Sequence, residues 1–150
     1  KAVITQNVDG LHQEAGNTNV IEYHGNHRWL VCMDCRKRLP FTPESAAVHP
    51  YPRCVKCGKA LKPDVVFFGE GIPMSEMARA NHEADRCKAM LIIGTSGVVY
   101  PAADIPHQAK SNGAVIIEIN VEKTPFTSSI TDHFLKGTAS DILPRVLEFL

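Results

Sequence analysis

The stretch "AMLIIGTSGVVYPAADIPHQAKSNGAVIIEIN" at residues 89–120 decides the fold class. Its two ends, 89–95 and 114–119, are continuous apolar runs of the kind that form strands buried on both faces of a sheet. Between them, residues 101–113 have the length of a helix and end in Asn-Gly, a typical helix stop. Strand, helix and strand in this order predict the βαβ unit of a parallel sheet.

The flanking sequence extends this unit in both directions. Residues 2–5 ("AVIT") predict another strand, and residues 74–88 and 140–150 predict helices. Residues 28–63 differ from the rest, because they are basic, proline-rich and cysteine-bearing and show little helical periodicity. We interpret this region as a small module inserted into the α/β domain.

Four of the five cysteines form two pairs, Cys32-x2-Cys35 and Cys54-x2-Cys57, with 18 residues between the pairs. A two-residue gap lets one tight turn present both sulfurs to a tetrahedral Zn²⁺, and the longer spacing is that of zinc ribbons. Four thiolates fill the coordination shell, so the predicted site is closed and structural. The nearby His24 and His27 are therefore not expected to be ligands.

Together these patterns predict an α/β fold. It has a Rossmann-like parallel sheet, incomplete at the N-terminus, and a small inserted zinc-ribbon-like domain. The expected bounds are 1–28 and 69–150 for the partial Rossmann-like domain and 29–68 for the zinc-binding module. The chain opens inside a predicted strand and without a methionine, so we expect that an upstream part is missing.

The bulk composition excludes several classes of partner. Sixteen basic residues balance sixteen acidic ones in 150 residues, which leaves no electrostatic footprint for nucleic acid or an anionic membrane. The longest apolar runs, such as 89–93, are too short to span a bilayer, and no signal segment opens the chain. We expect a cytoplasmic protein with neither a nucleic-acid nor a membrane partner.

Polar residues follow each of the three predicted strands. The first is followed by Gln6, Asn7 and Asp9, the second by "GTSG" at 94–97, and the third by Asn120. Ligands of open α/β sheets bind at the carboxyl ends of strands, so these ends, expected at one edge of one sheet, predict a nucleotide site. No G-x-G-x-x-G or Walker loop is present to cradle a pyrophosphate.

At this point the sequence resembles a known family, the sirtuins, which are NAD-dependent protein-lysine deacylases, and most of all their bacterial and archaeal members. The stretches that carry the resemblance are "TQNVDGLH" (5–12), "EYHG" (22–25), the cysteine quartet, "KPDVVFFGEGIP" (62–73), "GTSGVVYPAA" (94–103) and "IIEIN" (116–120). The resemblance implies an NAD-binding Rossmann-like domain and a zinc domain, with NAD and an acyl-lysine protein or peptide between them. It implies release of nicotinamide and O-acyl-ADP-ribose.

The resemblance also assigns roles to single residues. It implies that His24 is the general base on the ribose hydroxyls, with Asn7 and Asp9 in the catalytic set. The implied cofactor contacts are Gln6, Asn7, Val8, Asp9, Gly94, Thr95, Ser96, Asn120 and Ala139, where Asp9 and the Val8 backbone form the nicotinamide pocket. The implied substrate contacts are Val66, which bonds the acyl-lysine amide, Phe68, Gly69 and, on an opposing strand, Val99. His27 receives no role.

Two alternatives stay open. In the first, the chain is a zinc-ribbon protein-binding module without catalysis. In the second, it is a mono-ADP-ribosyltransferase, a class of enzyme that shares with deacylases the step that releases nicotinamide. The glycine-rich phosphate loop of sirtuins precedes the stretch at 5–12 and has no counterpart in these 150 residues. We therefore expect the chain to be a fragment that is inactive alone.

Overall fold

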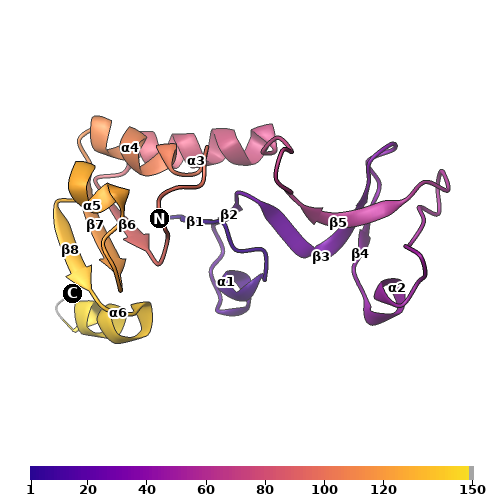
Figure 1. Ribbon diagram of the computed structural model, residues 1–150, viewed down its shortest axis with the longest axis horizontal. Coiled ribbons are helices and arrows are strands. Elements are labelled where there is room, and N and C mark those ends of the chain that lie inside the picture. The colour runs from indigo at the N-terminus through magenta and orange to yellow at the C-terminus, as the bar shows by residue number, and fades with distance from the viewer. Residues whose placement is uncertain (149–150) are drawn as a thin grey trace. The chain divides into compact units, whose positions relative to one another are not determined.

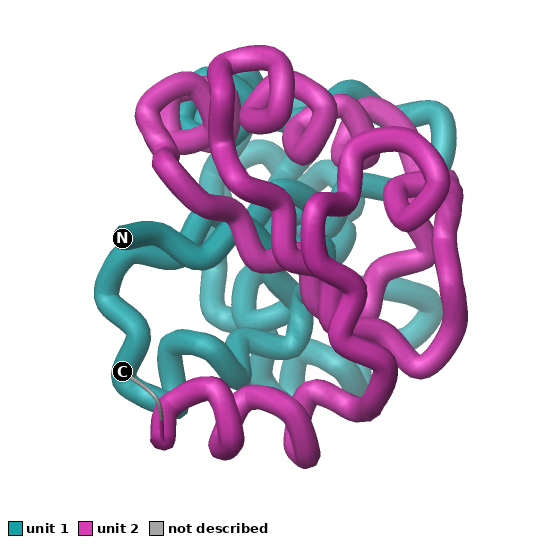
Figure 2. The backbone as a smooth tube through the Cα atoms, turned by 90° about the vertical axis from the view of Figure 1, so that its left-hand side faces the viewer, with its two compact units in different colours: residues 1–79 teal, residues 80–150 magenta. Residues whose placement is uncertain are grey.

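The computed structural model describes residues 1–148, which divide into two compact units between Arg79 and Ala80 (Figure 2). Each unit contains its own hydrogen-bonded sheets. Residues 149–150, which belong to the predicted C-terminal helix and domain, lie outside the described residues. The predicted domain bounds at 28 and 69 stay a prediction. None of the helices within residues 1–148 combines the length and apolar character needed to cross a bilayer.

The first unit begins with a two-stranded parallel ladder. Strand β1 (Val3–Thr5) pairs with β2 (Val20–Glu22), and the short helix α1 (Leu11–Glu14) lies in the connection between them (Figure 1). We expected β1 to lie at one edge of the same sheet as the two strands of 89–120. This is wrong, because β1 makes no ladder with them. The ladder partner of β1 is β2, a three-residue strand too short to be visible in the sequence pattern.

A three-stranded antiparallel sheet follows in the order β4-β3-β5. Its strands are β3 (Gly25–Cys32), β4 (Arg38–Pro40) and β5 (Leu61–Val65). A small buried cluster lies at one end of this sheet, and its members are Leu30, Cys32, Cys54 and Leu61. Helix α2 (Pro43–Ala46) begins at Thr42, whose side chain accepts a hydrogen bond from the Ser45 N–H in a capping box.

The second unit contains the predicted βαβ arrangement. Strands β6 (Ala89–Ile93), β7 (Val115–Asn120) and β8 (His133–Lys136) form a parallel sheet in the order β6-β7-β8. The connections contain α4 (Asp104–Ser111) and α5 (Pro125–Ser129), as Figure 1 shows. The sequence therefore predicted β6, α4 and β7 correctly, but it did not reveal β8.

Two more helices complete the chain. Helix α3 (Met74–Arg86) confirms the helix predicted at 74–88 and crosses from one unit into the other. Helix α6 (Ala139–Leu147) confirms the C-terminal helix within the described residues. The Thr138 side chain caps α6 by accepting a hydrogen bond from the Asp141 N–H at 3.2 Å.

A carboxylate lies in the middle of the second unit. Glu118 on β7 has no exposed surface, and its oxygens accept hydrogen bonds from three threonine hydroxyls at 2.6–2.8 Å. The donors lie in and around α5: Thr124, Thr127 and Thr131. A buried carboxylate is tolerated only with such partners, so these bonds fix the β7–β8 connection to the central strand.

Candidate functional site

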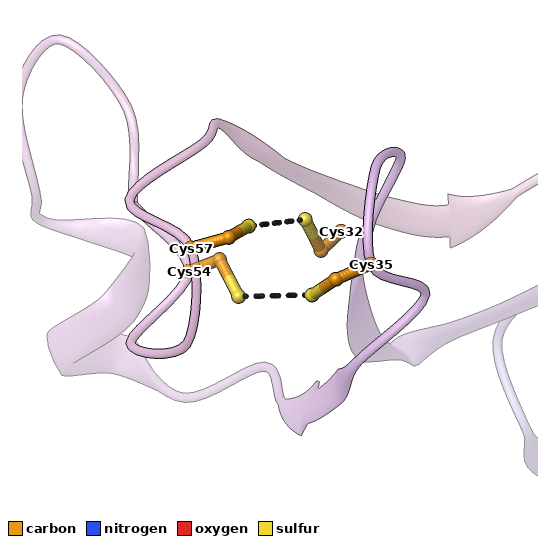
Figure 3. Close-up of side chains that lie close together, drawn as sticks. All are labelled: Cys32, Cys35, Cys54 and Cys57. Atoms are coloured by element: carbon orange, nitrogen blue, oxygen red, sulfur yellow. Dashed lines mark hydrogen bonds between the residues drawn. The ribbon is translucent and has the colours of Figure 1, made fainter.

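The four paired cysteines converge at the end of the small antiparallel sheet. Their sulfur atoms all lie within 4.8 Å of one another, and the Sγ–Sγ distances are 3.5 Å for Cys32–Cys57 and for Cys35–Cys54 (Figure 3). Zn–S bonds of about 2.3 Å in a tetrahedron require sulfur separations of about 3.8 Å. The cysteines are therefore positioned to hold a zinc ion, as the sequence predicted, and no histidine belongs to the group.

The two Cys-x-x-Cys turns repeat one backbone pattern. In each, the N–H of the first cysteine donates to the carbonyl five residues later, at 2.9 Å from Cys32 to Lys37 and 2.7 Å from Cys54 to Lys59. Cys32 and Cys54 are buried, Cys35 is partly buried and Cys57 is exposed. Each turn thus contributes one inner and one outer sulfur.

The backbone also influences which sulfurs are ionised. The Lys56 N–H, which donates to the Cys54 sulfur at 3.4 Å, is the largest cause that lowers the pKa of Cys54 to about 6. For Cys57, a backbone bond from Lys59 lowers the pKa, but the Cys32 sulfur and the other sulfurs raise it, to about 12. Because thiolates bind metals and thiols do not, an incoming cation has to displace the proton of Cys57.

Arg36 and Gly58, which lie four positions after Cys32 and Cys54, differ in backbone strain. Both have positive φ, +59° for Arg36 and +73° for Gly58, and a non-glycine residue in this region costs about 1–2 kcal/mol. Allowing for the flexibility that glycine adds to the unfolded chain, we expect Arg36→Gly to raise the free energy of unfolding by about 0.5–1 kcal/mol. Urea unfolding of the zinc-loaded chain measures this.

Two controls separate backbone strain from the loss of the arginine side chain. Arg36→Ala removes the side chain but keeps a Cβ, so it should give no gain. Gly58→Ala should destabilise by about 1 kcal/mol through φ alone, since no atom lies within 4 Å of its added Cβ. Equal stability of Arg36→Gly and Arg36→Ala would contradict the strain argument.

The loop after β1 carries the first group of predicted cofactor residues, and local bonds shape it. The Asn7 N–H donates to the Thr5 hydroxyl at 3.0 Å, and the Leu11 N–H donates to Asp9 Oδ1 at 3.0 Å. One carboxylate oxygen of Asp9 therefore accepts from the first residue of helix α1. Gln6, which is partly buried, lies in the same loop.

His27, which had no role in the sequence analysis, holds this loop. Its N–H donates to the Val8 carbonyl at 3.0 Å, and its ring Nδ1 also contacts that oxygen. Nothing in the sequence pattern could reveal the contact, because it joins residues 19 positions apart.

A polar network connects the loop's surroundings to strands β2 and β3. Glu22 Oε1 accepts hydrogen bonds from Gln13 at 2.6 Å, from Arg28 at 3.1 Å and from Asn26. Asn26 is buried, and its oxygen accepts from the Arg28 N–H and Nε at 2.7 and 2.9 Å. These bonds join α1, β2 and β3 and so limit the freedom of the polar loop.

The structure brings His24 next to a predicted substrate residue. The His24 carbonyl accepts a hydrogen bond from the Val66 N–H at 2.9 Å, and its ring contacts Tyr23 edge-on at 5.6 Å. Strand β5 stops at Val65, so Val66 lies directly beyond its end. Beyond Val66 the chain turns, and the Glu70 N–H donates to the Phe67 carbonyl at 2.9 Å.

The other predicted substrate residues lie in irregular backbone. Phe68 is fully exposed, and Gly69 has a φ of +85°, which the turn requires. Val99, in the second unit, lies in a bend rather than in the strand that the resemblance implied. Its carbonyl accepts a hydrogen bond from the Ala103 N–H at 2.9 Å, so it begins a helical turn.

The second group of predicted cofactor residues gathers at the carboxyl ends of β6, β7 and β8. The Asn120 side chain donates to the Thr95 carbonyl at 2.9 Å, and the Gly94 N–H donates to the Ile119 carbonyl at 3.0 Å. Ser96 follows Thr95 and is exposed, while Ala139 opens helix α6 after β8. The predicted convergence of polar strand ends is confirmed for this unit.

Comparisons with known proteins agree on one family. The model of the Sir2 family matches residues 1–101. An NAD-dependent protein deacylase of Pyrococcus furiosus is 48% identical over 153 residues, a match that covers 99% of this chain and 60% of the relative. The chain thus spans about 60% of the length of the curated relatives it matches.

Solved structures give the same result. A Sir2 homolog–NAD complex superimposes with a TM-score of 0.92 at 43% identity, covering 99% of this chain and 57% of the other. A complex of Sir2 with a p53 peptide and NAD⁺ gives a TM-score of 0.92 at 34% identity, covering 99% and 62%. Fold and sequence therefore lead to one family.

Proposed function

This chain belongs to the Sir2 family, and from that premise we propose that the protein is an NAD-dependent protein-lysine deacylase. The single observation that carries the proposal is the hydrogen bond from the Val66 N–H to the His24 carbonyl at 2.9 Å. It joins the residue proposed as general base to the residue proposed to hold the acyl-lysine. Both functions then meet at one point of the chain.

The loop after β1 supports a role in nicotinamide recognition. A primary carboxamide needs one donor and one acceptor from the protein. No described residue makes a hydrogen bond to the Val8 N–H, and Asp9 Oδ2 takes part in none among residues 1–148. We assign the carboxamide to these two groups, with Gln6 and Asn7 directed to the adjoining ribose.

The strand ends of the second unit support a role in holding the adenosine side of NAD. Gly94, Thr95 and Ser96 offer small side chains and main-chain groups where a ligand approaches closely, and Asn120 is already bonded to the Thr95 carbonyl. Ala139 contributes the first turn of α6. Bound NAD supplies the glycosidic bond that is broken and the ribose that receives the acyl group.

The catalytic assignment follows from the chemistry of the side chains. The proposed role of His24 is to accept a proton from a ribose hydroxyl, which then takes up the acyl group, because an imidazole exchanges protons near neutral pH. Asn7 orients the ribose or a water molecule beside it. Asp9 holds the nicotinamide amide and does not move a proton.

The substrate assignment rests on main-chain bonding. The Val66 N–H is taken by His24, and among residues 1–148 no donor reaches the Val66 carbonyl. That oxygen is a ready acceptor for the amide N–H of an acyl-lysine peptide lying alongside, the usual geometry of strand addition. We assign Phe68 to the wall of the lysine channel and Gly69 and Val99 to the flanking backbone.

We also propose that the small zinc-binding module spans 29–68 and that the protein works in the cytoplasm. Four closely spaced cysteines that stay unbridged suit a reducing compartment, where they hold metal rather than form disulfides. Proposed partners are acyl-lysine proteins or peptides, as in the Sir2 complex with a p53 peptide.

Product analysis tests the proposed function. The protein expressed from its complete reading frame, incubated with NAD and an acetyl-lysine peptide, should release nicotinamide and yield O-acetyl-ADP-ribose and free lysine in equal amounts. Mass spectrometry of the mixture measures all three. ADP-ribosylated protein would replace the proposal with mono-ADP-ribosyl transfer. The absence of nicotinamide release would leave a zinc-containing binding module.

A further inference from the structure

Two charged residues bracket the turn after β5. The Lys62 Nζ lies 2.5 Å from Glu70 Oε2, so an ion pair closes the segment from one end of β5 to the far side of the turn. Their side chains are only 21% and 35% exposed. Glu70 lies at the surface, and a surface ion pair by itself is weak, so the further bonds that both side chains make to the turn decide how firmly it is held.

Each partner also bonds to the backbone of the turn. Lys62 Nζ donates to the Val65 carbonyl at 2.8 Å, and Glu70 Oε2 accepts from the Phe67 N–H at 3.0 Å. Lys62 Nζ further lies 4.5 Å from the centre of the Phe67 ring. The pair thus fixes the main-chain groups immediately before and immediately after Val66.

These bonds leave one carbonyl presented for recognition. With the Val65 oxygen, the Val66 N–H and the Phe67 N–H all occupied, the Val66 oxygen is held between three fixed neighbours. The hydrogen bond from Lys62 lowers the pKa of Glu70, and the hydrogen bond from the Phe67 N–H lowers it further.

We propose that Lys62 and Glu70 are positioning residues that set the affinity for the acyl-lysine peptide by holding the Val66 carbonyl in its binding orientation. The inference rests on the proposed deacylase function. The hydrogen bonds of the pair go to each other and to the backbone of Val65 and Phe67, and Lys62 also lies over the Phe67 ring. Losing the pair therefore affects binding of the peptide and leaves the chemical step and NAD binding intact.

Steady-state kinetics on the protein expressed from its complete reading frame test this. Lys62→Met keeps the aliphatic stem and removes the charge, and Glu70→Ala removes the acceptor. Each should raise KM for an acetyl-lysine peptide about 5- to 20-fold, the usual effect of losing a charge-assisted hydrogen bond. The kcat and the KM for NAD should change less than about twofold. Lys62→Arg should restore most of the peptide affinity.

The double variant and a matched control sharpen the test. Lys62→Met/Glu70→Ala should raise KM no more than the worse single change, since the two residues act as one unit. Glu76→Gln breaks a comparable pair with Arg79, 2.8 Å apart on α3, and should leave peptide KM unchanged. Zinc content and the melting temperature, measured on every variant, show that it is folded.

The outcomes are separable. Three results would each overturn the positioning role. They are a wild-type peptide KM in folded Lys62→Met and Glu70→Ala, additive effects on KM in the double variant, and a loss in kcat as large as the rise in peptide KM. A wild-type protein that releases no nicotinamide refutes the deacylase proposal instead, and it does so before any variant is compared. If Lys62→Met does not fold, the peptide KM of Glu70→Ala, compared with that of Lys62→Arg, tests the positioning role instead.

Discussion

His24→Ala is expected to lower kcat for NAD-dependent deacylation by about 100- to 10,000-fold, the usual contribution of a general base. The change removes the imidazole but keeps the main-chain carbonyl that accepts from the Val66 N–H, so peptide KM should change little. Zinc content should not change at all, because the metal group contains cysteines alone. Nicotinamide release and metal analysis, measured on one sample, check both parts.

A histidine elsewhere provides the control. His82 is exposed on α3, and His82→Ala should retain wild-type kcat and zinc. Deacylation by His24→Ala within tenfold of the wild type would remove His24 from the catalytic set. Loss of zinc in that variant would mean that the histidine supports the metal site after all.

The second large effect is expected on removal of zinc. Among residues 1–148, the cluster beside the metal site has four buried members, two of which are the cysteines Cys32 and Cys54. Binding free energies of structural zinc are about 10–16 kcal/mol, more than so small a cluster supplies. Chelation should therefore unfold the β3–β4–β5 sheet, while the β6–β7–β8 sheet with its own buried residues stays folded.

Hydrogen exchange of backbone amides measures this selectively. The loaded protein should contain about one zinc per chain, and after chelation the amides of β3 and β5 should lose protection while those of β7 keep it. Cys32→Ser should behave like the chelated protein, and Cys87→Ser, which changes the one cysteine outside the group, should behave like the wild type. Protected β3 amides in zinc-free protein would contradict a structural role for the metal.

The sequence predicted the parts of the fold that depend on local pattern. The apolar runs at β6 and β7 and the helical stretches at α3 and α4 are long enough to be recognised from the order of apolar and polar residues alone. Strand β8 was not predicted because His133–Lys136 is short and has a charged end. Strand β2 was not predicted because it has three residues. Such short strands are stabilised by the hydrogen bonds and packing of the neighbouring strands rather than by the intrinsic β-propensity of their own residues.

The candidate site shows the same division. Cysteine spacing predicted the metal group, because coordination geometry restricts the sequence directly. His27, Lys62 and Glu70 were missed, since their contacts with Val8 and with the turn at 65–67 depend on tertiary folding. The end of β5 at Val65 depends on tertiary contacts in the same way, because the turn after it is held by the side chains of Lys62 and Glu70.

The repeated Cys-x-x-Cys turns have a consequence for how the metal is lost. Oxidants and competing chelators arrive from solvent, and they meet the outer sulfurs, Cys57 first and Cys35 next, before either buried one. Each turn then still holds one buried sulfur, that of Cys32 or Cys54. Damage by peroxide therefore starts at the outer sulfurs. It is reversible only while those sulfurs are oxidised no further than a sulfenic acid or a disulfide, which a thiol reductant returns to the metal-binding form.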